Sequence, residues 1–379
     1  MSEDSSSKPQ STCATAEGTA RYARRFKDRV ASGYFQETPN GLTLSSIGIG
    51  TYLGEPDALT DSGYADAVVA AIGGGINVID TAINYRFQRS ERSVGDALKR
   101  VFTGGFTRDE LVIATKAGFL TPDTEMPADP NEYFSREYLE RGIFAPEDIA
   151  AGCHCMSPAY LANQLERSLR NLNLKCLDIF YLHNPETQLG EISREQFDAR
   201  IISAFQFLES AVHEGKAAAY GLATWNGFRA SEHAKEYLSL EAMVNLARQA
   251  GGEGHHFKFV QLPLNLAMPE AFSQRNQTVQ GKQGSMVQAA RSLGITLISS
   301  AALLQGQLLR NLPTYIVDAL GLESNLQRAL QFARSTPGIT TALVGMSRVK
   351  HVQENLKMMS VDPATQEQYL KIFGHGGTH

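Results

Sequence analysis

The stretch GINVIDTAINYRFQRSERSVGDAL, residues 75–98, contains one repeating unit of the fold. Its apolar run INVID predicts a short buried strand, and Val94 and Leu98 then recur at helical spacing. Ser90 and Glu91 suit the N-cap and the acidic first turn of that helix. Glycines 73–75 suit the end of a preceding helix better than a phosphate-binding loop. The stretch therefore predicts a strand followed by a helix.

The same alternation repeats along the chain. Its apolar runs are SSIGIGTY, INVID, LVIATK, LDIFYLH, AAAYGLAT, FKFVQLPL, ITLISSA and TTALVGM, with helix-length segments between them. Continuously apolar strands are typical of a parallel sheet that is buried on both faces. Eight such units favour an α/β fold of the closed (β/α)8 TIM barrel type over an open doubly wound sheet. No GxGxxG follows the first strands, which weakens the dinucleotide-binding version of the open sheet.

Several segments lie outside this alternation. Residues 1–20 are rich in Ser, Thr and Ala, which predicts a disordered N-terminal tail, and residues 34–372 are expected to form a single barrel domain that begins with a β-hairpin. Residues 117–156 form a long insertion after the third strand, where barrel loops shape access to the site. Residues 266–285 are also extended and polar. They are expected either to fold over a ligand or to form an inert surface excursion.

Composition excludes some classes of protein. The chain is 42% hydrophobic, and its net charge of −5 is not concentrated in blocks, so nucleic acid and membrane surfaces are not expected partners. No apolar run approaches the roughly 20 residues of a membrane-spanning helix. The N-terminus lacks the apolar core of a signal peptide. We therefore expect a cytoplasmic protein with reduced thiols at its four cysteines, Cys13, Cys153, Cys155 and Cys176.

Polar side chains gather at the carboxyl ends of the predicted strands, where barrels place their sites. They are Asp80, Lys116, His183 and Gln261, with Tyr85 in the loop just after Asp80. Each alone is more often a cap, a solvated loop residue or a packing histidine. A lysine and an acid at neighbouring strand ends are costly to bury unpaired, so Asp80 and Lys116 are expected to pair.

These residue types together suit one chemistry. A tyrosine has an ordinary pKa of about 10, and a neighbouring ammonium is expected to lower the pKa of Tyr85. The imidazole of His183 can donate a hydrogen bond to the same incoming oxygen. The set is suited to protonating a carbonyl oxygen while a hydride is delivered to its carbon. Because no side chain supplies a hydride, a nicotinamide cofactor is implied.

The segments IDTAINY, VIATK and FYLHNPE resemble the signature segments of the aldo-keto reductases, in that family's order. The resemblance runs from about residue 34 to about residue 360, with IGIGTY, SSAALLQGQLL and GMSRVKHVQEN as further matches. It implies an enzyme that interconverts a small-molecule aldehyde or ketone and the alcohol. The implied cofactor is NADP, with NAD possible. By this resemblance Asp80, Tyr85, Lys116 and His183 form the catalytic tetrad, with Tyr85 as general acid.

The resemblance also implies a cofactor site across the barrel mouth. The matching positions are Thr51, Tyr52, Gln261, Ala301, Leu303, Gln305, Gly306, Gly345, Ser347, Arg348, Glu354 and Asn355. Some positions depart from the family: Ala223 and Thr224 replace a frequent Ser-Asn, Leu264 replaces a stacking aromatic, and His351 replaces a frequent arginine. Preference for NADP over NAD therefore stays open, although Arg348 supplies a cation.

Other motifs give weaker signals. Cys153-His154-Cys155 lacks a second ligand pair, so no metal site is expected. His255-His256 is expected in an exposed loop, and no GxSxG nucleophile motif occurs. The competing function is a nicotinamide-binding redox sensor or partner-docking protein without turnover. Substrate identity and oligomeric state cannot be read from the sequence.

Overall fold

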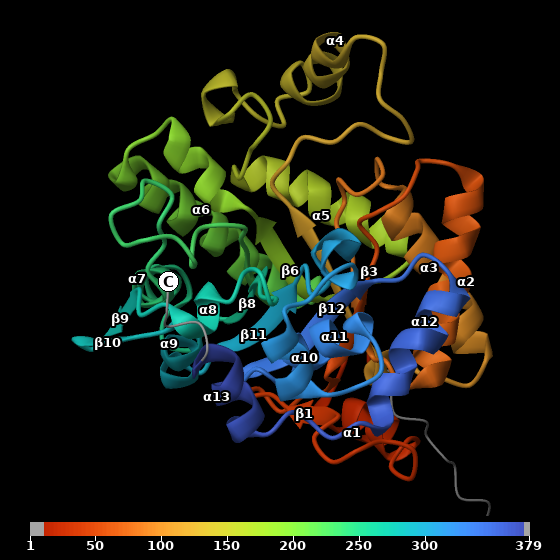
Figure 1. The fold of residues 1–379 in the computed structure, drawn as a ribbon. Helices are drawn as coiled ribbons and strands as arrows, with labels where there is room; N and C mark the ends of the chain where they lie inside the picture. Colours follow the sequence, from red (N-terminus) through yellow and green to blue (C-terminus); the bar gives the residue numbers. More distant parts are fainter. Residues whose placement is uncertain (1–10, 375–379) are drawn as a thin grey trace, which may run out of the picture.

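The computed structural model describes residues 11–374, which form a closed barrel of parallel strands wrapped by helices (Figure 1). Within that range the strands of the barrel follow one another in the order β11-β12-β3-β4-β5-β6-β7-β8. All eight predicted runs are these strands, so the (β/α)8 barrel is confirmed. Their bounds are β3 Ile47–Gly50, β4 Val78–Asp80, β5 Val112–Ala117, β6 Leu177–His183, β7 Ala217–Ala223, β8 Phe257–Pro263, β11 Thr296–Ser300 and β12 Ile339–Gly345.

A helix follows each barrel strand and covers its outer face. These helices are α2 Ala58–Gly74, α3 Arg89–Thr103, α5 Pro158–Leu172, α6 Arg194–His213, α7 Leu240–Gly251, α9 Met286–Leu293, α11 Asn325–Ser335 and α12 Val349–Leu356. Helix α2 ends at Gly75 with φ 115°, as predicted. The predicted N-cap at Ser90 is wrong, because α3 begins after Gln88. The Ser90 hydroxyl instead donates to the carbonyl of Thr51 at 2.8 Å.

The inside of the barrel is a small packed core. Inward-facing side chains such as Val112, Ile179 and Phe259 form one cluster with Leu44. Leu44 comes from the hairpin β1 Phe35–Glu37 and β2 Thr43–Ser45, which closes the amino-terminal end of the barrel. The predicted hairpin is thus confirmed. It leaves the opposite end, where the strands finish, as the open mouth.

The N-terminal segment differs from the expected disordered tail. Residues 16–20 are the start of helix α1, Ala16–Arg24, which is capped by Thr15 and packs on the barrel through Tyr22. Residues 1–10 lie outside the described residues. Docking of this segment brings the Cα atoms of Cys13 and Cys176 to 5.7 Å, and the two form a disulfide. The expectation of four reduced thiols is therefore wrong for this pair.

The insertion after β5 stands as a lobe beyond the barrel, at the top of Figure 1. It contains α4 Pro130–Phe134 and a π-helical turn, Ser135–Leu139. Its aromatic side chains make a cluster of their own around Tyr138 and Tyr160 on α5. The lobe is thus a small folded unit that is anchored at both ends to the barrel.

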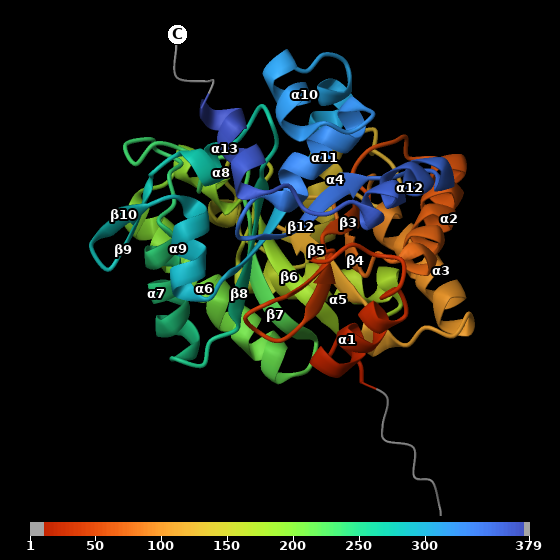
Figure 2. The ribbon, with the colours of Figure 1, turned by 60° about the horizontal axis from the view of Figure 1, so that its bottom comes forward.

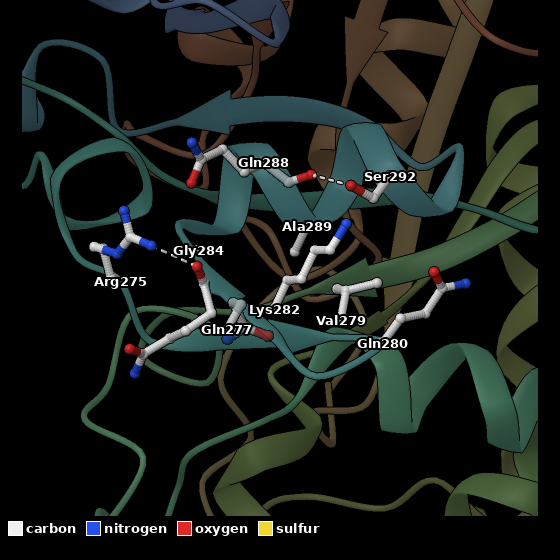
Figure 3. A pocket seen from close by; sticks show the side chains of 10 residues that line it. Arg275, Gln277, Val279, Gln280, Lys282, Gly284, Gln288, Ala289 and Ser292 are labelled. Atoms are coloured by element: carbon white, nitrogen blue, oxygen red, sulfur yellow. Dashed lines mark hydrogen bonds between the residues drawn. The ribbon is translucent and has the colours of Figure 1, made fainter.

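The segment after β8 forms α8 Glu270–Ser273 and the hairpin β9 Gln277–Val279 and β10 Lys282–Gly284. Figures 1 and 2 both place this hairpin at the outer edge of the molecule, beside α9. The hairpin and α9 line a polar hollow of about 300 Å³. Figure 3 shows the side chains that line it. This hollow shares no lining residue with the pocket at the mouth, so the segment is a surface excursion.

The remaining α-helices are α10 Thr314–Leu320 and α13 Gln366–Gly374. Nowhere in residues 11–374 is there a helix with the length and apolar character needed to cross a membrane.

Candidate active site

A buried ion pair lies at the floor of the barrel mouth. Lys116 near the end of β5 is fully buried, and its Nζ lies 2.6 Å from Asp80 Oδ1 at the end of β4. The same ammonium donates to the Thr81 carbonyl at 2.9 Å and to the Tyr85 hydroxyl at 3.1 Å. The second carboxylate oxygen, Asp80 Oδ2, accepts from Gln261 Nε2 at 2.7 Å. The predicted pairing is therefore present, and one cation joins the acid to the phenol.

The electrostatics of the pair follow from its burial. Burial raises the pKa of the Asp80 carboxyl, and the Lys116 ammonium and the Gln261 amide offset this only in part. Burial alone would lower the pKa of Lys116, but the Asp80 carboxylate and the Tyr85 oxygen together raise it by more than burial lowers it. The pKa of Lys116 therefore lies above its usual value. The ammonium consequently stays charged at any pH near neutrality.

Tyr85 sits partly exposed above this pair, with its ring against Tyr52 at 4.9 Å between centroids. Burial raises the pKa of Tyr85 above its ordinary value; Lys116 lowers it, and Asp80 raises it again. The expected lowering is therefore wrong in direction, because burial raises the pKa of Tyr85 by more than the Lys116 ammonium lowers it, and the Asp80 carboxylate adds to the rise. Tyr85 is held in its protonated form, which is the form a general acid needs.

The chain is strained immediately after Tyr85. Arg86, Phe87 and Gln88 have φ values of 50°, 57° and 70°, a left-handed run that residues other than glycine seldom adopt. Buried Arg86 is held by Asp61 Oδ1 at 2.5 Å, and Gln88 donates to the Pro122 carbonyl of the insertion at 3.3 Å. Because the surroundings fix this run, they also fix where Tyr85 points.

His183, the last residue of β6, completes the group. Its ring lies edge-on to Tyr85 at 5.8 Å and to Phe119 at 5.2 Å between centroids. Burial, and then the Lys116 ammonium, hold the pKa of His183 well below its ordinary value. The imidazole is therefore neutral, and it can donate one hydrogen bond. The structure thus brings all four predicted tetrad residues together at one point.

A pocket of about 960 Å³ opens above the tetrad. Of the positions expected to contact a cofactor, it is lined by Thr51, Tyr52, Gln261, Ala301, Leu303, Gln305, Gly306, Gly345, Glu354 and Asn355. Ser347 and Arg348 are not among its lining residues; Arg348 is instead the N-cap of α12. The other predicted positions therefore line one pocket that reaches from Tyr85 to α12.

The chemistry of this pocket fits a dinucleotide. Thr224 Oγ1 near the tetrad and Asn355 Oδ1 at the α12 end are buried, and neither has a hydrogen-bond partner among residues 11–374. Both line the pocket, so a polar ligand that spans it would satisfy them. Gln261 already uses one end of its amide on Asp80, which leaves its oxygen for a ligand.

Two buried residues that contact the site, Glu186 and His154, are not among the positions predicted from the sequence. Buried Glu186 accepts through Oε1 from the backbone amides of Trp225 at 2.7 Å and of Asn226 at 3.1 Å, which fixes the loop that carries Trp225 into the pocket. His154 is fully buried and bonds to the backbone of His183. The glutamate in FYLHNPE was a visible signal, but His154 lay in a segment with no periodic pattern.

His255 and His256 lie in the loop before β8, as expected, but only one of them is exposed. His255 is 7% exposed, whereas the His256 side chain is 44% exposed, with its Nδ1 2.7 Å from Glu209 Oε2. Across the described residues, no group of three or more His, Cys, Asp or Glu side chains is arranged to hold a metal ion.

A family model and two relatives match the sequence of this chain. The model of the Aldo/keto reductase family matches residues 46–311. A Schizosaccharomyces pombe protein named as a voltage-gated potassium channel subunit beta is 25% identical over 79% of each chain. The NADH-specific methylglyoxal reductase of Escherichia coli is 28% identical over 52% of each chain, about half of its length.

Solved structures share the fold. An aldo-keto reductase from Klebsiella pneumoniae in complex with NADPH has a TM-score of 0.61 at 20% identity, over 91% of this chain and 95% of that one. The glycerol dehydrogenase of Gluconobacter oxydans has a TM-score of 0.62 at 18% identity, with the same coverage. The chain belongs to the aldo/keto reductase family of NAD(P)-dependent oxidoreductases.

Proposed function

We propose that this chain reduces an aldehyde or ketone to the alcohol with NADPH or NADH, and that Tyr85 is the general acid. The observation that carries the proposal is the single ammonium of Lys116, which contacts both Asp80 and Tyr85. When bound, the nicotinamide supplies the hydride. The Tyr85 hydroxyl gives its proton to the carbonyl oxygen, and neutral His183 donates a hydrogen bond that orients this oxygen.

The pocket lining supports an uncharged substrate. Beside the tetrad the pocket is lined by the aromatic rings of Tyr52, Phe119 and Trp225, which offer apolar surface to a substrate. None of its described lining residues is lysine or arginine, and Lys116 lies beneath its floor. An anionic carbonyl compound would find no cation there to replace its hydration. We therefore expect neutral aldehydes and ketones to be preferred over keto acids or phosphorylated sugars of similar size.

The choice of cofactor and the location stay predictions. The printed names of the relatives include both an NADH-specific enzyme and a complex with NADPH. Arg348 and Lys350 are the cations available near the α12 end for a 2'-phosphate, so NADP is the first choice. A cytoplasmic location stays a prediction, and the Cys13–Cys176 disulfide argues against it, because disulfides are rare in that compartment.

The alternative is a nicotinamide-binding protein that docks on a partner without turnover. It is supported by the name of the Schizosaccharomyces pombe relative. Two measurements separate the candidates: binding of NADPH, followed by quenching of Trp225, the single tryptophan, and oxidation of NADPH with a panel of neutral carbonyl compounds. Binding without turnover on a broad panel would support the docking protein.

The variant Tyr85→Phe tests the general acid. Loss of a positioned proton donor is expected to lower kcat by about 10²-fold or more, while the affinity for NADPH changes little. Tyr181→Phe is the matched control, because its hydroxyl is buried inside the barrel with no hydrogen-bond partner among the described residues. Undiminished activity in Tyr85→Phe would contradict the assigned role.

A further inference from the structure

A side chain from the insertion holds the backbone of His183. The Nε2 atom of His154 lies 2.8 Å from the carbonyl oxygen of His183, and His154 is fully buried. On its other side, His154 Nδ1 lies 3.0 Å from Gln188 Nε2. Gln188 Oε1 in turn accepts from Arg200 at 2.8 Å. A chain of hydrogen bonds through the fully buried side chains of His154 and Gln188 thus runs from α6 to the end of β6.

The chemistry of its members fixes the direction of this chain. Arginine has only donors, so the group of Gln188 that faces Arg200 is the amide oxygen. The amide nitrogen of Gln188 must then face His154 and donate to Nδ1. A neutral imidazole that accepts at Nδ1 carries its hydrogen on Nε2, and that hydrogen is donated to the His183 carbonyl. Burial lowers the pKa of His154 to about 4, so this one tautomer persists at neutral pH.

The backbone around His154 is built for this contact. Residue 154 is bridged to Phe119, with the amide of Cys155 donating to the Gly118 carbonyl at 2.7 Å. A Cβ at position 118 would lie 2.7 Å from both His154 Nε2 and the His183 oxygen, so only glycine leaves room for the bond. The Phe119 ring packs edge-on against both imidazoles, at 5.2 Å between centroids in each case.

We propose that His154 is a positioning residue for His183, and that the insertion of residues 117–156 acts on the active site through it. His154 does not line the pocket, so it acts through the neighbours that do: His183, which accepts its hydrogen bond, and Phe119, which packs on its ring. The inference rests on the proposed function, because the position of His183 matters for orienting a carbonyl oxygen. A displacement of about 1 Å in such a group can lower a rate by about 10²-fold.

Kinetics of three variants test the proposal. His154→Leu and Gln188→Leu are expected to lower kcat by about tenfold or more, a loss of about 1.4 kcal/mol in transition-state stabilisation, with the Kd for NADPH within about twofold. His154→Gln places an amide nitrogen where Nε2 stood and is expected to recover activity to within about threefold of wild type. Tyr138→Phe is the control, because it removes a comparable buried bond, from its hydroxyl to the Thr121 carbonyl at 3.0 Å, and should keep wild-type kcat.

A second measurement does not depend on turnover. Nitrogen-15 NMR of histidine-labelled protein without cofactor is expected to show His154 protonated on Nε2. The His183 ring signals should shift in His154→Leu and return in His154→Gln. If wild type shows no turnover, the proposed function fails, and these spectra still decide the positioning role.

The proposal is overturned if folded His154→Leu keeps kcat within twofold of wild type, or if His154 carries its proton on Nδ1. Equal losses in His154→Gln and His154→Leu would also overturn it, because they would point to packing alone. If His154→Leu does not fold, the comparison of Gln188→Leu with Tyr138→Phe decides the question by the same kinetic criterion.

Discussion

Replacing Lys116 by methionine removes the ammonium from the floor of the site and leaves Asp80 without its cation. Both partners are buried, since Lys116 is fully covered and Asp80 is 3% exposed. The variant therefore loses the 2.6 Å ion pair between Lys116 Nζ and Asp80 Oδ1 completely. Removing one partner of a buried pair usually costs about 3–5 kcal/mol in the free energy of unfolding, because the remaining charge is uncompensated. Gln261 is then the remaining side-chain donor to Asp80.

The loss should depend on pH. Burial already raises the pKa of Asp80, and removing Lys116 raises it further. Folded Asp80 then binds a proton where the unfolded chain has released it, so the stability of Lys116→Met falls as pH rises above about 4. The double variant Lys116→Met/Asp80→Asn carries no buried charge at this point. It is expected to regain most of the lost stability and none of the activity.

The assay is urea unfolding at pH 5 and pH 8, together with NADPH oxidation. Lys99→Met is the matched control, because Lys99 also contacts an aspartate, Asp96, at 3.0 Å, but its side chain is 58% exposed. An exposed pair contributes less than about 1 kcal/mol, so this variant should behave as wild type. The reasoning is refuted if Lys116→Met is as stable as wild type at pH 8, or if the double variant is no more stable than the single one.

Three further predictions concern the cysteines, the buried histidine and the pocket loop. Unfolded, unreduced protein should show two reactive thiols, and Cys13→Ala should lower stability by about 4 kcal/mol through loss of its bond to Cys176; four thiols would contradict the pairing. Folding lowers the pKa of His154 from 6.5 to about 4, so the free energy of unfolding should fall by about 3 kcal/mol as pH drops from 6.5 to about 4. His154→Gln should lack this contribution to the pH dependence of stability; the same pH dependence in both proteins would contradict a neutral buried His154. Glu186→Ala removes the acceptor of the backbone amides that hold the loop of Trp225, so KM for the carbonyl substrate should rise about tenfold. Glu186→Gln keeps an acceptor oxygen and should stay near the wild-type KM. An unchanged KM in the alanine variant would exclude this role.

The barrel and the tetrad could be predicted because both depend on local patterns. Apolar runs locate the strands, and a parallel barrel brings every strand end to one mouth, so Asp80, Lys116 and His183 had to meet. The net pKa of Tyr85 could not be predicted in the same way. It depends on how deeply the phenol is covered and on the distance from Asp80, and neither is encoded in a short segment.

The misses were contacts between distant segments. His154 bonds to a backbone carbonyl, and because every residue has one, no pattern marks the partner 29 residues away. Cys13 and Cys176 are 163 residues apart in the sequence, and they meet only because the segment before α1 docks on the barrel. Helix α1 itself left a signal, since Thr15 precedes it and Tyr22 and Phe26 are spaced by four residues. The Ser, Thr and Ala content before it outweighed that signal.

The left-handed run after Tyr85 has a consequence for how this enzyme can change over time. Glycine would adopt the backbone of residues 86 or 88 with less strain, but either exchange would also remove a side chain that ties the loop to α2 or to the insertion. Selection for heat tolerance alone would allow glycine to replace Arg86 or Gln88 and so remove the backbone strain. Selection for turnover would retain both side chains. Laboratory lineages evolved under the two pressures are therefore expected to diverge first at these positions.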